Sequence, residues 1–502
     1  MEFVIQVECR LAGKVLHRKD VATITREATP LLPERVGLTL GDGKTVLSTI
    51  QRAVVTDQVE AEAAAWWKCP HCHQPKRIKD RRSRRVRTTF GEVVVSCRRY
   101  HSCICRGGRP RIEWPLRRAL PARATPEYSY LLAKWGGRMP YRRAAAYMRA
   151  LLPLRRSEIS YGSVRRCTIE TGRRIENRAL DRDEYEWESA GRTRVDAANH
   201  VQVAIDGTWI RAAPGAYGRQ LHVVAGRIER DGRLGGHFAW LPEATGATGA
   251  MMKSALDDDG LTSHSRLDVL ADGADGLESV VREAAGRPPS QRLDWFHLSM
   301  RLRPIEQMVD RVASLVPDEE HRRALQHDAP RLRWQLWHGR WRDAVRRTHQ
   351  LSRSIRTLAS TASGADRDRL RRFGRHLAGL RRYLRSNSHL LFHYARTRRG
   401  GRWISTATAE SGMNHVVNAR MGKRQPMRWS AEGAHLLLQV RCALLDDRLD
   451  GLFREWYPGL GTSLPAVAIS PAVLAPRFVT RPLNDSNTSG GLLETHSTIQ
   501  GF

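Results

Sequence analysis

The segment VQVAIDGTWIRAA, residues 201–213, has the composition of a buried β-strand that carries a carboxylate. β-Branched residues alternate along its first half, which is the period of a strand, and the segment then reaches Gly207. Asp206 stands where a core strand ordinarily has an apolar side chain. A turn or capping aspartate before a glycine is the alternative interpretation. Asp206 is therefore the first candidate for a functional carboxylate.

Two further segments repeat this pattern downstream. RLDVLADGADGL rises through apolar residues to Asp272, with Asp275 as a rival for the same role, and QRLDWFHL places Asp294 and His297 around two aromatic residues. An unpaired buried carboxylate costs several kcal/mol. Two of them at strand ends of one sheet need a counter-charge, which a divalent metal ion supplies.

Residues 201–297 predict a mixed α/β sheet, because three strands come first and strands then alternate with helices. The expected strands are Val201–Ile210, Leu221–Ile228, Gly236–Leu241, Leu267–Asp272 and Arg292–Phe296, and the expected helices are 247–256 and Gly276–Ala285. In Ser299–Gly401 apolar residues recur at helical spacing, so we expect an all-α insertion. The order of elements and the two aspartates resemble the RNase H-like fold of nucleases and DDE transposases.

Length and composition suit a multidomain α+β protein, because 502 residues with 41% hydrophobic content exceed a single domain of about 150 residues. We expect neither a membrane partner nor a signal peptide, since no apolar run of about 18 residues occurs and no apolar stretch follows a basic start. The expected parts are a strand and helix region (1–67), a zinc-ribbon-like module (68–120), a helix-turn-helix-like DNA-binding domain (121–195), the first part of the catalytic core (196–298), the arginine-rich insertion (299–402), the C-terminal helices of the core (403–458) and a flexible tail rich in Pro, Ser and Gly (459–502).

In the first of these parts we expect a strand at Phe3–Val7, a hairpin turn at Gly41–Gly43 and a helix at Thr45–Trp67. Residues 125–180 predict three helices, with a break at Gly136–Gly137. The third helix is a candidate for the DNA major groove through Ser163, Arg165 and Arg166. Packing of three helices without DNA contact is equally compatible with the pattern.

Four clustered cysteines predict a structural zinc site. Cys69 and Cys72 stand in a CPHC knuckle, and Cys103 and Cys105 follow about thirty residues later in HSCIC. The second pair has a shortened spacer, so His101 or Cys97 could replace one of its members. Nothing acidic converges on these residues, which argues against a catalytic zinc ion. Reduced thiols without metal are the alternative.

Positive charge is concentrated in two segments. Residues 68–118 hold 16 Lys and Arg against three acidic residues, and residues 321–402 hold 22 Arg against four Asp, so the two carry +13 and +18 of the net +32. Two such patches beside a neutral centre predict a polyanionic partner, most simply DNA. The candidate DNA-binding residues are Arg81, Arg82, Arg84, Arg85, Arg165, Arg166, Arg371, Arg372, Arg381 and Arg382.

A third carboxylate for a metal site is expected after the helical insertion. Glu410, in AESGMNHVVNARMGKRQPMRWS, stands nearest the end of the insertion, and Glu432 in the following helix is its rival. An ordinary glutamate in the first turn of a helix is the alternative interpretation.

The series CPHC, RYHSCIC, TPEYSYLLAKWGGRMPY, VAIDGTWI, VLADGADGL, LDWFHLSMRL and SGMNHVVNARMGKRQPMRWS resembles bacterial insertion-sequence transposases of the ISKra type. Through DWFH it is also similar to the wider Mutator and hAT group. The likeness spans roughly Cys69 to Leu449. It implies an RNase H-like core in which Asp206, Asp272 and Glu410 form a DDE triad, with Asp294 and His297 in the motif after the second aspartate.

The resemblance implies DNA cleavage and strand transfer at two Mg²⁺ ions held by the triad, with Mn²⁺ able to substitute. His297 would then orient the scissile strand or a flipped base, unless it is a core histidine. The zinc and helical modules would bind the terminal repeats, and the insertion would bind transposon-end or target DNA. A homodimer or larger homo-oligomer associated with the nucleoid in a bacterial cytoplasm is implied. The competing hypotheses are an inactive zinc-containing DNA-binding regulator and an RNase H-like nuclease that cuts without joining.

Overall fold

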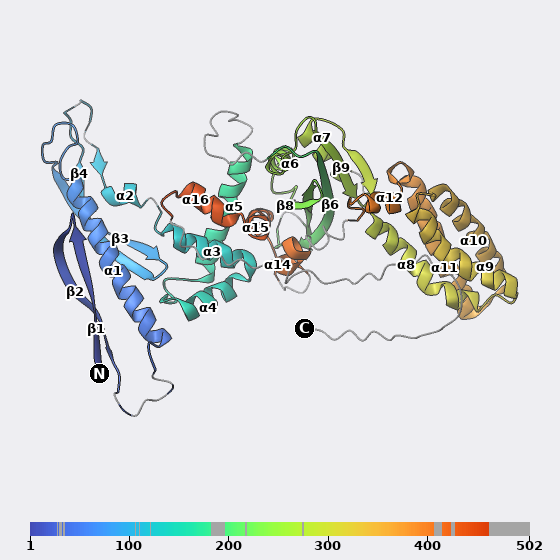
Figure 1. The fold of residues 1–502 in the computed structure, drawn as a ribbon, viewed down its shortest axis with the longest axis horizontal. Helices are drawn as coiled ribbons and strands as arrows, with labels where there is room; N and C mark the ends of the chain where they lie inside the picture. Colours follow the sequence, from blue (N-terminus) through green and yellow to red (C-terminus); the bar gives the residue numbers. More distant parts are fainter. Residues whose placement is uncertain are drawn as a thin grey trace. The chain divides into compact units, whose positions relative to one another are not determined.

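The computed structural model describes residues 1–460 except 28, 30–32, 34–35, 106, 110, 121, 182–195, 216–217, 274–275, 406–413 and 423–426. Glu410 and Asp275 therefore lie outside the described residues, as does nearly all of the tail expected at 459–502. The fold is a mixture of helices and strands, as expected (Figure 1). Among the described helices, none has the length and apolarity needed to cross a bilayer.

A five-stranded mixed sheet carries the candidate aspartates. Its order is β10-β9-β6-β7-β8, in which β6, β7 and β8 are antiparallel neighbours while β9 and β10 run parallel to β6. The strands are β6 (His200–Arg211), β7 (Gln220–Arg230), β8 (Arg233–Trp240), β9 (Arg266–Ala271) and β10 (Ser290–Leu293). The expected mixed sheet is thus confirmed, with bounds that differ by a few residues.

One expected strand is too long. The strand expected at Arg292–Phe296 ends at Leu293, because the side chain of Asp294 caps helix α8 (Trp295–Ala313). The Asp294 carboxylate accepts hydrogen bonds from the backbone N–H groups of Phe296 and His297, so both aromatic residues of the motif are helical. A short polar side chain that accepts from these orphan N–H groups is the usual start of a helix.

Helices cover both faces of this sheet. On one face, Val203 and Ile205 pack with α6 (Thr248–Asp258) and α7 (Leu277–Ala285). On the other face, residues of β6, β7 and β8 pack against α15 (Ala431–Leu445). Alternate residues of a strand point to opposite faces, so a strand covered on both sides is apolar nearly throughout. This explains why β6 can bury almost every side chain up to Asp206.

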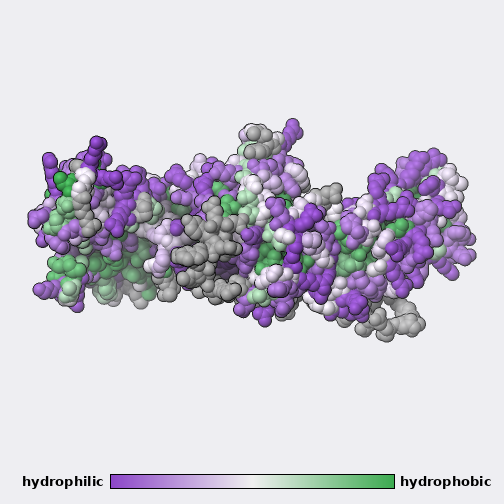
Figure 2. Space-filling model, turned by 90° about the horizontal axis from the view of Figure 1, so that it is seen from above, coloured by the Kyte–Doolittle hydropathy of each residue, from purple (hydrophilic) through white to green (hydrophobic). Residues whose placement is uncertain are grey.

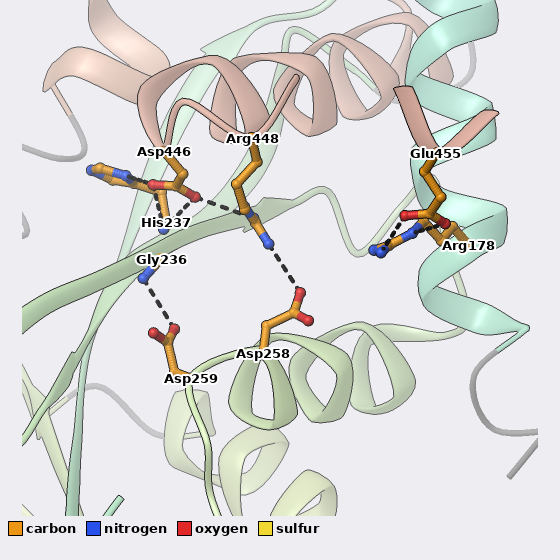
Figure 3. A network of polar contacts seen from close by, with 8 residues as sticks. All are labelled: Arg178, Gly236, His237, Asp258, Asp259, Asp446, Arg448 and Glu455. Carbon is orange, nitrogen blue, oxygen red and sulfur yellow. Dashed lines mark hydrogen bonds and ion pairs between the residues drawn. The ribbon is translucent and has the colours of Figure 1, made fainter. Parts of the chain in front are cut away.

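A polar network joins the end of α15 to the sheet (Figure 3). The Asp446 carboxylate accepts hydrogen bonds from the backbone N–H and the ring Nδ1 of His237 on β8, and it pairs with Arg448 at 3.1 Å. Arg448 also pairs with Asp258 of α6 at 2.9 Å. Helix α16 (Leu449–Trp456) follows directly, so this network fixes the direction in which the chain leaves the core.

The arginine-rich insertion is helical, as expected, and has a hydrophobic core of its own. Its helices after α8 are α9 (Glu319–Trp337), α10 (Trp341–Thr361), α11 (Gly364–Ser386), the short η2 (Ser388–Leu390) and α12 (Tyr394–Arg399). Apolar residues of α8 to α11 interlock, while most arginines face outward. The surface of this part is accordingly mostly hydrophilic (Figure 2, right).

The N-terminal part begins with a two-stranded hairpin and a long helix. The elements are β1 (Glu2–Leu11), β2 (Lys14–Thr25), α1 (Leu40–Ala65), β3 (Ile78–Thr88), β4 (Gly91–His101), β5 (Ile112–Glu113) and α2 (Pro115–Ala119). The hairpin turn expected at Gly41–Gly43 is wrong, because Thr39 and Asp42 form a capping box that makes those glycines part of α1. The turn lies instead at Ala12–Gly13, both with positive φ.

The three helices expected after the cysteine module are present as α3 (Pro126–Arg138), α4 (Tyr141–Leu151) and α5 (Tyr161–Leu180). The break expected at Gly136–Gly137 is wrong, since both glycines lie inside α3. A Cβ at Gly136 would overlap Thr168 of α5, and one at Gly137 would lie 2.5 Å from Leu444 of α15. These glycines therefore allow close helix packing and do not mark a turn. The chain between α12 and α15 contains η3 (Asn414–Asn418) and α14 (Ala419–Met421).

Candidate functional site

Asp206 and Asp272 meet because their strands are parallel neighbours. The last paired residues of β6 and β9 are Ala204 and Leu270. Continuing this register by two residues sets Asp206 opposite Asp272, which follows the last residue of β9. The carboxyl ends of parallel strands commonly form binding sites, since the chain leaves the sheet there.

His297 reaches the same edge from the first turn of α8. β10 is the parallel neighbour of β9, and the backbone N–H of Asp294 extends this pairing by donating to the carbonyl of Ala271 at 2.9 Å. The Asp294 side chain is fully buried and lies 2.7 Å from Nδ1 of His297. This contact fixes the imidazole ring and leaves Nε2 as the nitrogen available to a ligand.

Asp206, Asp272 and His297 form one cluster. Each offers a ligand atom, and these atoms lie within 4.8 Å of one another. All three residues are partly buried, so the cluster stands at a surface that a substrate can reach. Two carboxylates and an imidazole at this spacing can bind a cation or a phosphate-containing substrate that brings cations with it.

The electrostatics of the cluster favour an added positive charge. Burial raises the pKa of Asp206, the N–H of Gly207 and His297 oppose this shift, and Asp272 and Asp294 add to it. The hydrogen bond to Asp294 raises the pKa of His297 despite its burial, and Asp206 and Asp272 raise it further. The raised pKa of His297 favours the imidazolium form, whose charge would balance part of the carboxylate charge.

Tyr383 of α11 holds the loop that carries Asp272. Its hydroxyl donates to the backbone carbonyl of Asp272 at 2.7 Å, and the guanidinium of Arg301 lies 4.0 Å from the centre of its ring. Burial raises the pKa of Tyr383 to about 12, so it stays a donor at neutral pH. Sequence reasoning missed this residue. Its only signal was an aromatic residue within the arginine-rich segment LRRYLRS.

The third carboxylate expected from sequence is not among the described residues if it is Glu410. Its rival Glu432 is exposed in the first turn of α15, where it forms an ion pair with Arg173 of α5. Glu432 does not belong to the cluster of Asp206, Asp272 and His297.

The four cysteines expected to bind zinc come together as Cys69, Cys72, Cys103 and Cys105. The sulfurs of Cys69 and Cys105 are 3.8 Å apart, and those of Cys72 and Cys103 are 3.5 Å apart. In a tetrahedral site with Zn–S bonds of about 2.3 Å, sulfurs lie about 3.8 Å apart. The group could therefore hold a zinc ion with little movement.

The rival ligands are elsewhere. Cys97 is buried in the core beneath α1, with its thiol 3.3 Å from the carbonyl of Arg98, and His101 is not part of the cysteine cluster. The N–H groups of Cys72 and His71 lower the pKa of Cys69 to about 6, which favours the thiolate that a metal requires.

The expected DNA-binding arginines of the cysteine module lie on β3. Arg81, Arg82 and Arg85 are exposed. Arg84 is only partly exposed, lies 5.8 Å from the centre of the Trp114 ring and has its pKa lowered by burial. Arg84 is therefore a packing residue in part. The other three are exposed, although Arg81 donates to Ser96, Arg82 lies 3.8 Å from Asp80 and Arg85 lies 3.6 Å from Glu92.

The remaining arginines lie on two helices. Arg165 and Arg166 are exposed near the start of α5, and α11 carries Arg371, Arg372, Arg381 and Arg382. Of the four on α11 only Arg381 is partly buried. The exposed arginines of α5 and α11 are suited to contact phosphates, because their guanidinium groups lie at the surface of the two helices.

Comparison with known proteins does not identify a family for this chain. The sequence matches no model of a known protein family, and no curated protein matches it significantly. The resemblance to ISKra-type transposases thus rests on the motifs alone. The chemistry of the site rests on Asp206, Asp272, Asp294 and His297.

Proposed function

We propose that this protein is the DNA transposase of an insertion sequence, which binds the terminal repeats of its element and catalyses Mg²⁺-dependent strand cleavage and strand transfer. One observation carries the proposal: Asp206 and Asp272, on parallel neighbouring strands, converge with His297 at the edge of the sheet. A protein that only binds DNA has no need for carboxylates in a site that phosphates would occupy.

The topology of the sheet supports an RNase H-like core. Three antiparallel strands are followed by two that run parallel to the first, and the Arg-rich helices follow the fifth strand. The likeness in sequence motifs leads to the same fold. We therefore assign the first part of the catalytic core to the sheet and its C-terminal helices to α15 and α16.

Asp206 and Asp272 would hold Mg²⁺, with Glu410 as the third carboxylate. Carboxylate oxygens are the ligands that Mg²⁺ prefers. The raised pKa of Asp206 indicates that nearby positive charge does not fully compensate this buried carboxylate. Glu410 follows Ile404 by six residues, and the carbonyl of Ile404 accepts from the N–H of Trp295 at 2.9 Å. The chain from Ile404 to Glu410 can span at most about 20 Å. When bound, two Mg²⁺ ions would activate the attacking oxygen and stabilise the leaving one.

The residues around the carboxylates would position the DNA. Asp294 holds His297 with Nε2 toward the site, where a protonated ring donates to a phosphate oxygen of the scissile strand. Tyr383 anchors the backbone of Asp272 from the insertion. In this proposal the insertion fixes one catalytic carboxylate and offers exposed arginines to the same DNA.

The cysteine module and the helices α3 to α5 would select the terminal repeats through exposed arginines, with zinc in a structural role. Joining two ends in one reaction calls for at least a dimer. The proposed setting is the nucleoid of a bacterial cytoplasm.

The test is a cleavage and joining reaction on labelled DNA that carries the flanks of this gene, with Mg²⁺ or Mn²⁺. Wild-type protein should give cut and joined products, and Asp206→Asn should bind the DNA equally well and give none. Asp368→Asn removes an exposed carboxylate of α11 and is the matched control.

The products separate the competing functions. Cutting without joining would favour a nuclease. Equal binding without cutting by either protein would favour a regulator. Loss of DNA binding by Asp206→Asn would contradict the catalytic role given to this residue.

A further inference from the structure

The hairpin β1–β2 has little apolar packing to stabilise it. It forms a sheet of two strands, and only Ile24 of its apolar side chains is buried. Phe3 and Leu16 are more than half exposed. A two-stranded hairpin is marginally stable in water unless something else holds it.

Three metal-binding side chains meet at this junction. Cys9 of β1 and His17 of β2 are directly paired across the hairpin, next to an irregularity in the register after Cys9. Asp57 comes from α1. Each of the three offers a ligand atom within 4.8 Å of the others, and all three are partly buried.

The distances suit a tetrahedral metal ion. Nε2 of His17 lies 3.2 Å from Oδ2 of Asp57. With metal–ligand bonds of about 2.0 Å, two ligand atoms of a tetrahedral zinc site are about 3.3 Å apart. The other carboxylate oxygen, Oδ1, lies 3.3 Å from Nζ of Lys19. Lys19 thus contacts only Oδ1 and holds the carboxylate in place with Oδ2 toward His17, as outer-shell partners of metal ligands do.

The imidazole of His17 also lacks a full set of partners. Its Nδ1 is buried and has no hydrogen-bond partner among the described residues. A simple ion pair with Asp57 occupies only Nε2. The protein groups of the hairpin and α1 therefore do not fully satisfy this buried ring.

We propose that Cys9, His17 and Asp57 bind a second zinc ion, separate from that of the four-cysteine cluster, which clips the hairpin onto α1. One thiolate, one imidazole and one carboxylate are a zinc-type donor set and neutralise its charge, and they leave a fourth position for water. The site draws one ligand from each of three elements, so metal binding would order all three together. This proposal is independent of transposase activity.

The test is the zinc content of the full-length protein after purification and removal of loosely bound metal. Wild type should hold two zinc ions per chain. Cys9→Ser and His17→Gln should each hold one. Glutamine can still donate a hydrogen bond to Asp57, so His17→Gln keeps the ion-pair partner while losing the metal ligand.

Controls separate this site from the cysteine cluster. Cys167→Ser removes a thiol outside both groups, whose sulfur lies 3.2 Å from the carbonyl of Ser129, and should keep two zinc ions. Cys69→Ser with Cys72→Ser should leave one, and adding Cys9→Ser should leave none. Hydrogen exchange at β1 and β2 should be faster in Cys9→Ser than in wild type, and unchanged exchange in the other elements would show that the rest of the protein is folded.

Either of two results would overturn the proposal. One is a wild-type protein that holds a single zinc ion, lost with the double cysteine variant and unaffected by Cys9→Ser. The other is a zinc content of two that His17→Gln and Cys9→Ser leave unchanged.

Discussion

Two helices of this protein begin with the same local motif and differ in everything around it. At the start of α8, Asp294 caps the helix and contacts Nδ1 of His297. At the start of α9, Asp318 caps the helix and contacts Nδ1 of His321 in the same spacing. The first aspartate is fully buried, whereas the side chains of the second pair are 59% and 76% exposed.

The capping motif by itself starts a helix, and only its surroundings make it part of a site. Near His297 lie Asp206 and Asp272, brought there by parallel strand pairing. His321 has no such neighbours among the metal-binding groups of the described residues. Burial strengthens electrostatic interactions, so only the α8 motif acts on other charges.

The largest expected difference between the motifs is catalytic. Under the proposed function, His297→Ala should reduce strand cleavage by about 10²–10³-fold, the range typical of a lost positioned donor. His321→Ala should leave the rate unchanged. The measurement is single-turnover cleavage at saturating protein, with DNA binding monitored in parallel. Equal rates for both variants would remove His297 from the site.

The next difference is in stability. Asp294→Ala deletes a buried cap that contacts two backbone N–H groups and an imidazole, and should cost about 3 kcal/mol of unfolding free energy. Asp318→Ala deletes an exposed cap and should cost about 1 kcal/mol. Urea denaturation of the two variants measures both values. A similar cost at both helices would mean that burial of Asp294 contributes nothing.

The sequence distinguishes these motifs only through their flanks. DWFH sits between apolar residues, which favours a site, whereas DEEH sits among charges, which favours a solvated helix start. The strands β6 and β9 were likewise predictable, because their apolar residues recur with the period of a strand. The cysteine cluster was predictable from local spacing, since each pair of ligands lies within a few residues and β3–β4 brings the pairs together.

Other features depend on packing that no local pattern encodes. The contact of Tyr383 with Asp272 joins residues on α11 and after β9, and nothing near Tyr383 in sequence indicates it. Gly136 and Gly137 look like a helix break, and only the helices α5 and α15 packed against them explain their place inside α3. The strand expected to reach Phe296 failed because the cap of Asp294 overrides the strand propensity of Trp295 and Phe296.

The two motifs should also differ in how their contribution to stability depends on pH. The contact with Asp294 raises the pKa of His297, so this residue adds stability that is complete below the unfolded value of about 6.5 and is lost as pH rises through the folded pKa. Asp294→Asn keeps a capping side chain and removes the charge. The variant should lose this pH-dependent stability, by about 1 kcal/mol, and the imidazole should titrate at lower pH by NMR. Asp318→Asn is the control, and an unchanged titration of His297 in Asp294→Asn would contradict the pairing.

Asp206 should change stability in the opposite direction. Burial raises the pKa of Asp206, so its charge opposes folding above that pKa and the penalty fades as pH falls toward the unfolded value of about 3.9. In the absence of metal, Asp206→Asn should therefore be at least as stable as wild type at pH 7, and the gain should close near pH 4. Denaturation at several pH values in EDTA measures it. A variant that is less stable at pH 7 would show that the carboxylate is satisfied without a cation.

The smallest expected effect concerns the support of the site from the insertion. Tyr383→Phe removes one hydrogen bond, from the hydroxyl to the carbonyl of Asp272, and keeps the ring under Arg301. A single neutral hydrogen bond contributes about 1 kcal/mol, so cleavage should slow by about fivefold or less while the Mg²⁺ concentration for half-maximal rate rises. Tyr147→Phe, at an exposed position of α4, is the matched control. If Tyr383→Phe changes stability but not the Mg²⁺ dependence, the insertion supports the fold and does not position Asp272.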